Sequence, residues 1–274
     1  MALPRFLTSS ASRGVRWSVC AIEVGGSRKD LCTWEADAVL PSASAAKVLV
    51  LLEAARAVSG GGATLAEPLS RTNVAPVADS GLWQHLATDT LPLGDVARLV
   101  GAVSDNWATN VLLRRLGGIE QIAATAEGLD IRDVFLHDIL RDVRNPVDPV
   151  TLSTGTARGY AELFARLASA DGIDADVTAQ VCDWLGDGVD LSMVVGAFGL
   201  DPLAHTLADR GFRVINKTGT DAGVRVDVGF VEGPSRTVAY ACLAGWDERL
   251  DPSLRDDVLA EMRAFGMLLR ELTA

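Results

Sequence analysis

The sequence predicts an α/β protein of the α+β type, in which one antiparallel sheet is built from strands at both ends of the chain. Segments rich in β-branched residues and bounded by turn residues occur near the N-terminus and again in the last third. Between them, apolar residues recur with a helical period. The strand segments are 16–24, 31–36, 212–217, 223–231 and 237–245. Strands at both ends around a helical middle predict two layers whose sheet is shared by the termini.

The predicted organisation has two domains. Residues 1–43 and 196–274 form a discontinuous domain of sheet and flanking helices, and residues 44–195 form an inserted all-helical domain. The functional site is expected between them, because the N-terminal hairpin leads directly into the helix that starts after Ser44.

The helices of the middle region are bounded by glycine-rich or polar stretches. They are predicted at 45–58, 96–103, 107–116, 119–127, 155–170 and 175–186. A closing amphipathic helix is predicted from Asp251 to about Leu272, with Asp251 as its N-cap. Residues 128–153 form a long loop, and loops of this length in compact domains are usually functional.

The composition excludes several classes of protein. A chain of 274 residues with 49% hydrophobic residues is long enough to bury a large core. The net charge of −11 argues against nucleic acid as a partner, because phosphate binding needs a basic face. No run of about 18 apolar residues is free of charge, so no membrane span is expected.

The N-terminus and the cysteines bear on the compartment. The first residues lack the apolar core of a signal peptide, so we expect a cytoplasmic protein, secreted only if a leader has been removed. The four cysteines form no C-x-x-C pair and there are only three histidines, so free buried thiols are expected and no metal site or other cofactor. The expected partner is a small-molecule substrate, and the oligomeric state stays open.

A candidate nucleophile stands at the start of a buried helix. Ser44 and Lys47 are three residues apart and therefore share a helix face. The run that follows is apolar nearly all round, which indicates a helix inside a domain. Burial lowers the pKa of a lysine, and a neutral amine beside a hydroxyl can take its proton. This is the chemistry of an S-x-x-K serine nucleophile.

The scarcity of lysine strengthens this interpretation. With sixteen serines and three lysines, chance alone gives roughly 0.2 occurrences of S-x-x-K. The other cations are 22 arginines, which cannot give up their proton in a protein, whereas a lysine can. A lysine at position 47 therefore indicates a residue that takes part in proton transfer.

Two further motifs follow in the chain. The polar trio 104–106, Ser-Asp-Asn, lies between two predicted helices, and 217–220, Lys-Thr-Gly-Thr, lies at the end of a strand. Each has a structural alternative, as a helix joint with an N-cap or as a strand end with an exposed lysine. S-x-x-K, S-D-N and K-T-G in this order and in these contexts are the signature of penicillin-recognising enzymes.

On these motifs the chain resembles the class A β-lactamases and, more loosely, the penicillin-binding transpeptidases. The similarity extends to the neighbouring segments 79–86, 103–118, 216–220 and 227–231, and it covers roughly residues 16 to 270. It implies the β-lactamase/transpeptidase-like fold, with the active site between the sheet domain and the helical domain.

The resemblance also implies roles for the residues of the first two motifs. Ser44 would attack the lactam carbonyl, with Lys47 as base or as part of its hydrogen-bonded relay. Ser104 would pass the proton to the departing nitrogen, and Asn106 would hold the substrate amide and Lys47. The backbone N–H groups of Ser44 and Thr220 would form the oxyanion hole, and one such donor is typically worth ~10²–10³ in rate.

The third motif would bind the substrate. Lys217 would supply positive charge for the substrate carboxylate and for the Ser104 hydroxyl, with Thr218 and Gly219 as further substrate-binding residues. Arg225, on the following strand, is the candidate for a second carboxylate-binding cation. That assignment needs a turn one residue shorter than usual, and the alternative is a solvated strand arginine.

One departure from the family concerns deacylation. Class A enzymes carry a loop glutamate that activates the deacylating water, but this chain has no glutamate between Glu127 and Glu162. The expected position falls near residues 135–138. His137 and Asp138 are the candidates for a substitute general base, because either side chain can accept a proton from water. The alternative is that both are ordinary loop residues.

Three functions remain open at this stage. The first is a class A β-lactamase-like serine hydrolase that opens a β-lactam through an acyl-enzyme at Ser44, with deacylation undecided. The second is a penicillin-binding acyl acceptor or sensor without efficient turnover. The third is an intracellular serine esterase or amidase on the same fold, which the missing signal peptide motivates.

Overall fold

The computed structural model describes residues 7–26, 28–204, 207–249 and 251–274; residues 1–6 of the predicted first domain lie outside them. A five-stranded antiparallel sheet has the order β2-β1-β10-β9-β8. Its strands are β1 (Arg16–Glu23), β2 (Asp30–Trp34), β8 (Arg213–Asp221), β9 (Val224–Glu232) and β10 (Thr237–Gly245). The N-terminal strands join the C-terminal ones where β1 pairs with β10, so the predicted sheet is confirmed.

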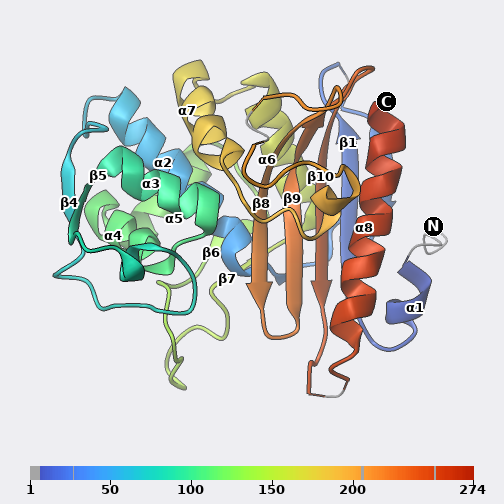
Figure 1. Ribbon diagram of the computed structural model, residues 1–274, viewed down its shortest axis with the longest axis horizontal. Helices are drawn as coiled ribbons and strands as arrows, with labels where there is room; N and C mark the ends of the chain where they lie inside the picture. Colours follow the sequence, from blue (N-terminus) through green and yellow to red (C-terminus); the bar gives the residue numbers. More distant parts are fainter. Residues whose placement is uncertain (1–6, 27, 205–206, 250) are drawn as a thin grey trace.

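The two faces of the sheet belong to two hydrophobic clusters. Along β1, Trp17, Val19 and Ala21 lie in one cluster, while Cys20 and Ile22 lie in the other. This alternation follows from the period of two in a strand, and both faces are buried because helices cover each of them. The structure thus has helices on both faces of the sheet (Figure 1).

The terminal helices cover one face. The short helix α1 (Thr8–Ala11) packs on α8 (Leu254–Thr273), which runs along the sheet together with η4 (Val194–Ala197) (Figure 1). Helix α8 starts after Ser253, so Asp251 is not its N-cap as predicted. The Asp251 carboxylate instead accepts from the Ser253 N–H and hydroxyl, which closes the turn before the helix. Among the described helices, none is long and apolar enough to cross a membrane.

The other face meets the helical part of the chain. The centre of this helical part is α2 (Lys47–Ser59), which is buried nearly all round because four helices surround it. These are α3 (Leu93–Val103), α4 (Asn106–Leu116), α5 (Gly118–Gly128) and α7 (Ala175–Gly186). Helix α6 (Ala157–Ser169) lies against β1, β9 and β10 and links this part to the sheet.

The prediction that residues 44–195 are all-helical is wrong in detail. The segment contains the short strand pair β4 (Pro68–Ser70) and β5 (Thr90–Pro92). It also contains β6 (Val134–Leu136) and β7 (Ser153–Gly155), which form a small sheet with β3 (Leu40–Pro41). These strands are two or three residues long, so their alternation is too short to be recognised in sequence, and only long-range pairing reveals them.

The cysteines are free, and their burial differs from the expectation at one position. Cys20, Cys182 and Cys242 are buried and Cys32 is half-buried. Burial raises the pKa of the Cys182 thiol to about 11. Buried thiols of this kind are kept protonated and are poor nucleophiles.

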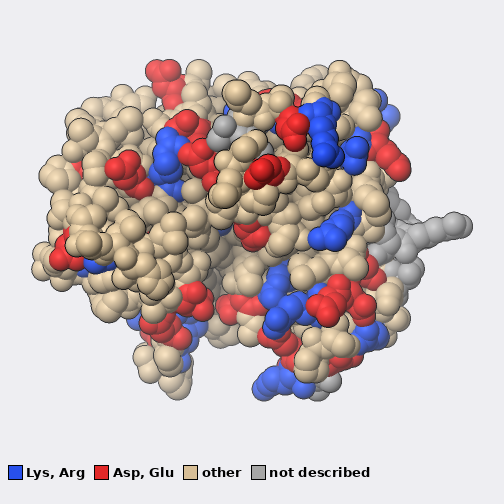
Figure 2. Space-filling view, viewed as in Figure 1, with Lys and Arg blue, Asp and Glu red and all other residues tan. Residues whose placement is uncertain are grey.

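Acidic and basic side chains are mixed on the surface. On the face in Figure 2, blue and red groups lie beside one another. Arg158, for example, contacts Asp37 at 2.8 Å and Asp30 at 3.1 Å. Such exposed pairs contribute little stability each, so the fold depends mainly on the buried clusters.

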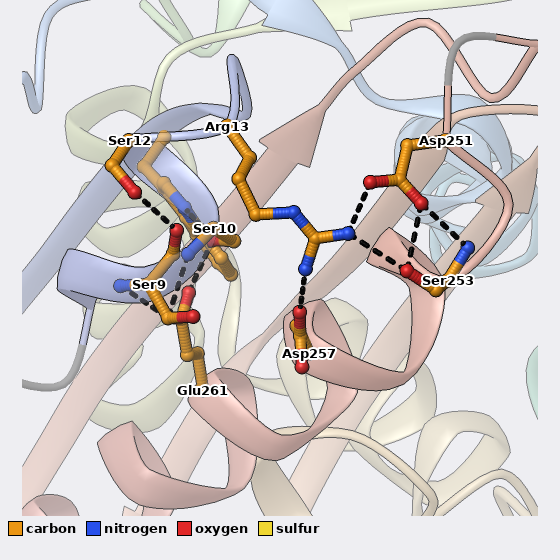
Figure 3. A network of polar contacts seen from close by, with 9 residues as sticks. Ser9, Ser10, Ser12, Arg13, Asp251, Ser253, Asp257 and Glu261 are labelled. Atoms are coloured by element: carbon orange, nitrogen blue, oxygen red, sulfur yellow. Dashed lines mark hydrogen bonds and ion pairs between the residues drawn. The ribbon is translucent and has the colours of Figure 1, made fainter.

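One buried carboxylate fastens the N-terminal segment to the last helix (Figure 3). Glu261 of α8 accepts from the backbone N–H groups of Ser9 (3.1 Å) and Ser10 (3.0 Å) and from the Ser10 hydroxyl. The Ser10 oxygen in turn accepts from the Trp17 indole at 3.0 Å. Glu261 therefore joins α1, β1 and α8.

We predict that Glu261→Leu lowers the free energy of unfolding by about 1–3 kcal/mol, because the Ser10 N–H and hydroxyl lose their acceptor in a buried site. Urea denaturation followed by circular dichroism measures the change. Glu271→Ala, at an exposed position of the same helix, is the control and should change stability by less than about 0.5 kcal/mol. Equal midpoints for both variants would contradict the role of Glu261.

Candidate active site

Ser44 lies in a single 3-10 turn, η2 (Ala43–Ala46), that runs directly into α2. It is half-buried and lines a cavity between the sheet and the helices. The residue before it, Ala43, has φ +45°, a left-handed conformation that a residue with a Cβ rarely adopts. The prediction of a helix after Ser44 is confirmed, and the nucleophile itself stands at the strained entrance to that helix.

Lys47 is the first residue of α2 and its side chain is fully buried. Its Nζ donates to the Ser104 carbonyl at 2.6 Å, to the Asn106 Oδ1 at 2.7 Å and to the Ser104 hydroxyl at 3.2 Å. The first two motifs are therefore joined through one amine, as the resemblance implied. Among the described residues, Ser44 is not a hydrogen-bond partner of the Lys47 amine, which therefore faces the S-D-N trio.

Burial and charge make Lys47 a weaker base than an exposed lysine. Loss of solvent lowers the pKa of Lys47 well below its usual range, and the positive charge of Lys217 lowers it further. Burial also lowers the pKa of Lys217, to about 8. The lowered pKa favours the neutral Lys47 amine, which is the form that a base toward a serine hydroxyl requires.

The S-D-N trio forms the joint between α3 and α4. Ser104 ends α3 in a left-handed conformation with φ +56°, which turns its carbonyl toward Lys47. Asp105 caps α4 by accepting from the Ala108 N–H at 2.8 Å. The other carboxylate oxygen of Asp105 accepts from the N–H groups of Leu82 (2.7 Å) and Trp83 (2.8 Å). The trio is therefore a helix joint, and its residues also supply the oxygens that contact Lys47.

The segment 79–86 is held against this joint. Gly81 has φ +119°, and a Cβ on it would lie 2.3 Å from the Asp105 side chain. Only glycine fits so close to the carboxylate in this conformation. The Ser80 hydroxyl donates to the Ser104 carbonyl at 3.3 Å, so this segment supports the same oxygen that Lys47 uses.

The K-T-G motif lies on β8, which passes directly beside the turn of the nucleophile. A Cβ on Gly219 would lie 2.3 Å from the Ser42 carbonyl and 3.2 Å from the Ser44 nitrogen. The glycine therefore allows the strand to approach the oxyanion-hole position. Lys217 is 3% exposed, and its Nζ donates to the Thr218 carbonyl at 2.9 Å.

These motifs meet in one cavity of about 940 Å³. Six of the predicted site residues line it, namely Ser44, Ser104, Asn106, Lys217, Thr218 and Thr220. Lys47 and Gly219 are not lining residues, but Lys47 contacts Asn106 of the lining and Gly219 packs against the turn that carries Ser44. Within the described part of the chain, no group of three or more His, Cys, Asp or Glu side chains is arranged to hold a metal ion.

Arg225 lies outside this cavity lining. Its Nη1 donates to the carbonyls of Asp221 (2.9 Å) and Val224 (2.7 Å), and its guanidinium lies 5.8 Å from the centre of the Trp246 ring. Its position beside the β8–β9 turn therefore favours a structural role over the predicted contact with a substrate carboxylate. The shorter turn brings Arg225 opposite Thr220, and the guanidinium satisfies the turn carbonyls.

The two candidate deacylation bases also lie away from the cavity. His137 is exposed, with Nε2 2.8 Å from the Thr154 hydroxyl. Asp138 pairs with Arg141 at 2.8 Å. Neither residue lines the cavity, so the assignment of a general base to either one is not supported by the geometry. The pairing of β6 with β7 continues at His137, whose N–H donates to the Leu152 carbonyl at 2.8 Å, and the Asp138 carboxylate is held by Arg141.

Leu140 is the loop residue that sequence reasoning missed. Its backbone is clamped by the buried Asn110 side chain, which accepts from the Leu140 N–H at 2.9 Å and donates to the Leu140 carbonyl at 2.9 Å. Leu140 lines the cavity together with Ser44. Asn110 stands one helical turn after Asn106, and this spacing was the available signal. Asp142 of the same loop also lines the cavity and accepts from the Ala78 N–H at 3.1 Å.

Comparisons with known proteins identify the family of the chain. The model of the β-lactamase enzyme family matches residues 4–254, so the chain belongs to that family. β-Lactamase 1 of Streptomyces cacaoi is 25% identical over 179 residues, which are 65% of this chain and 53% of that protein. The chain therefore spans about half the length of this relative.

Solved structures show the same fold. A class A β-lactamase from Mycobacterium abscessus superposes with a TM-score of 0.80 at 20% identity, covering 99% of both chains. A leucine-to-glutamate mutant of PBP-A, an acyl-enzyme complex with penicillin G, superposes with a TM-score of 0.77 at 21% identity, covering 97% of this chain and 94% of that one. The predicted β-lactamase/transpeptidase-like fold is confirmed.

The two lysines predict a pH profile for acylation by a carboxylate-bearing β-lactam. The second-order rate constant should rise with pH as Lys47 becomes neutral, at a pH well below the usual range of lysine. It should fall as pH rises through about 8, because Lys217 then loses the charge that attracts the carboxylate. Stopped-flow measurement of this rate constant from about pH 5 to about pH 10, the ordinary range of lysine, tests both the rise and the fall. In Lys217→Arg the alkaline fall should disappear, and its persistence would exclude Lys217 as its cause.

Proposed function

We propose that the protein is a penicillin-recognising serine hydrolase that is acylated at Ser44 by β-lactams or related amides and esters, and that it releases the acyl group slowly. The observation that carries this proposal is the Lys47 amine held by Ser104 and Asn106, which line the same cavity as Ser44 and Lys217. The membership in the β-lactamase enzyme family supports the class of reaction.

Acylation proceeds in two stages. The Ser44 oxygen attacks the carbonyl carbon while its proton passes to the neutral Lys47 amine, and the oxyanion accepts from the N–H groups of Ser44 and Thr220. The C–N bond then breaks, and the nitrogen takes a proton from the Ser104 hydroxyl. Lys47 returns its proton to Ser104 across the 3.2 Å contact between them. The product is an ester at Ser44 with both lysines in their starting states.

Lys217 and Thr218 bind the carboxylate that accompanies the reacting carbonyl. Within the described residues, the Lys217 ammonium donates to one backbone carbonyl, so further N–H groups can bind an anion. Thr218 lines the same part of the cavity. Because Lys217 is nearly completely buried, its attraction for an anion is weakly screened.

Slow release of the acyl group follows from the loop. Hydrolysis of an ester at Ser44 needs a base beside the water, and the loop residue of the cavity lining whose backbone Asn110 clamps is an aliphatic leucine. The Asp142 carboxylate lines the cavity but is engaged by the Ala78 N–H. A similar fold occurs in PBP-A, and the structure of its leucine-to-glutamate mutant as an acyl-enzyme complex with penicillin G supports acylation on this fold. An acyl acceptor therefore fits the site better than a fast β-lactamase.

The second candidate function is hydrolysis of an ester or amide other than a β-lactam. Its support is the charge of the cavity lining, where the carboxylates of Asp79, Asp142, Asp190 and Asp221 stand against the cations of Arg141, Arg144 and Lys217. A lining with this excess of negative charge disfavours substrates with several carboxylates. A panel of chromogenic esters with neutral or cationic groups separates this function from the first.

We predict that benzylpenicillin gives a covalent adduct on Ser44 that persists for hours. Intact-mass spectrometry and peptide mapping identify the adduct and its position. Ser44→Ala should form none, because the attacking oxygen is gone, whereas Ser59→Ala at the exposed end of α2 should react like the unmodified sequence. Rapid release of hydrolysed penicillin without an adduct would show efficient turnover and contradict the proposed slow step.

We predict that Leu140→Glu shortens the lifetime of this adduct by at least about 10²-fold, the typical contribution of a general base. The Asn110 clamp fixes the backbone of residue 140, and this residue lines the cavity with Ser44, so the substitution places a carboxylate at the cavity wall. Leu140→Gln is the matched control, since its side chain has the same length but cannot take a proton from water. Equal lifetimes for the two variants would refute the assignment of position 140.

A further inference from the structure

A chain of buried hydroxyl groups lies directly beneath the nucleophile turn. The Tyr160 hydroxyl of α6 donates to the Ser42 Oγ at 2.8 Å, and the Ser42 Oγ lies 2.8 Å from the Ser153 Oγ. The Ser153 Oγ then donates to the Ala43 carbonyl at 2.6 Å. Ser42, Ser153 and Tyr160 are fully buried. The roles described above for the three motifs do not involve any of them.

The direction of this chain is determined by its last member. The Ala43 carbonyl can only accept, so the single proton of Ser153 points to it. Ser42 must then donate to Ser153, and Tyr160 must donate to Ser42. Burial raises the pKa of Tyr160, which keeps the phenol a neutral donor. All three hydroxyl protons therefore point the same way, toward the Ala43 carbonyl.

The last acceptor in this series of hydroxyl groups is the carbonyl of the peptide group between Ala43 and Ser44. The Ala43 carbonyl and the Ser44 N–H belong to one peptide unit, and that N–H is a proposed oxyanion donor. A hydrogen bond to a peptide oxygen polarises the unit and makes its N–H a stronger donor. The same bond holds Ala43 in its left-handed conformation, φ +45°, which costs roughly 1–2 kcal/mol for a residue with a Cβ.

The surroundings of the chain are shaped to keep it in place. The Ser42 N–H donates to the Ser153 carbonyl at 3.1 Å, so the two serines are joined by backbone as well as by side chain. A Cβ on Gly155 would lie 2.6 Å from the Tyr160 ring, which shows that glycine makes room for the ring at this point of β7. The Tyr160 hydroxyl is thereby directed at Ser42.

We propose that Tyr160, Ser42 and Ser153 are positioning residues for acylation, which orient and polarise the Ala43–Ser44 peptide so that the Ser44 N–H binds the oxyanion. This inference rests on the proposed function, because it concerns the transition state of acylation at Ser44. The chain acts on the rate of the chemical step, and it has no contact with the substrate in the ground state.

The test is single-turnover acylation with a chromogenic cephalosporin, which separates the dissociation constant of the first complex from the acylation rate constant. Ser153→Ala should lower the rate constant about tenfold, less than the ~10²–10³ lost with an entire oxyanion donor, and leave the dissociation constant unchanged. Tyr160→Phe should lower it about threefold, because it only weakens the chain from its far end. The double variant should match Ser153→Ala, since the chain is already cut there.

The control is Ser10→Ala, which removes another fully buried serine hydroxyl that also accepts one bond and donates one, on the opposite face of the sheet. It should be destabilised without a change in acylation.

In Ser153→Ala the infrared carbonyl stretch of the acyl-enzyme should move to higher wavenumber, because the oxyanion donor is weaker.

The outcomes separate this inference from the proposed function. No adduct on Ser44 in the unmodified protein overturns both. Normal acylation in the unmodified protein with an unchanged rate in Ser153→Ala, or with the same loss in Ser10→Ala, overturns the positioning role alone. Additive losses in the double variant also contradict a single cooperative chain.

Discussion

The contact of the buried Lys47 amine with Ser104 and Asn106 is the interaction on which the geometry of the site depends. A lysine side chain without solvent is costly to bury unless polar groups surround its nitrogen, and three oxygens from the α3–α4 joint do so here. One of them is the Ser104 carbonyl, which faces the amine only because Ser104 is left-handed. The conformation of the joint, the cap by Asp105 and the position of segment 79–86 all follow from keeping those oxygens in place.

A second constraint is the close passage of β8 beside the nucleophile turn. A side chain at Gly219 would collide with the Ser42 carbonyl, so the strand can bring Lys217 and Thr220 to the site only with glycine between them. On the opposite side of the turn, Ser153 holds the Ala43 carbonyl. The nucleophile thus lies between a strand of the large sheet and a strand of the small one, and it owes its orientation to both.

Much of this was predictable because local patterns determined it. The period of two gave the strands of the large sheet, and the helical period gave α7 with the same bounds, 175–186, as predicted. The motif residues were found by their types and order, and the structure brings six of them into one cavity. The predictions for His137, Asp138 and Arg225 did not agree with the geometry, because each depended on the path of a loop or turn that distant contacts decide.

The sequence by itself determined the class of chemistry: a hydroxyl and a scarce lysine at helical spacing on an apolar helix, with two partner motifs at a helix joint and a strand end. Only the tertiary structure decided which residues of the loop line the cavity and what holds the turn that carries Ser44. The Leu140 backbone is held by the Asn110 amide of α4, 30 residues earlier. The Ala43 carbonyl is held by the Ser153 hydroxyl, 110 residues later. Contacts of this separation depend on the packing of whole elements, and local side-chain patterns carry no information about them.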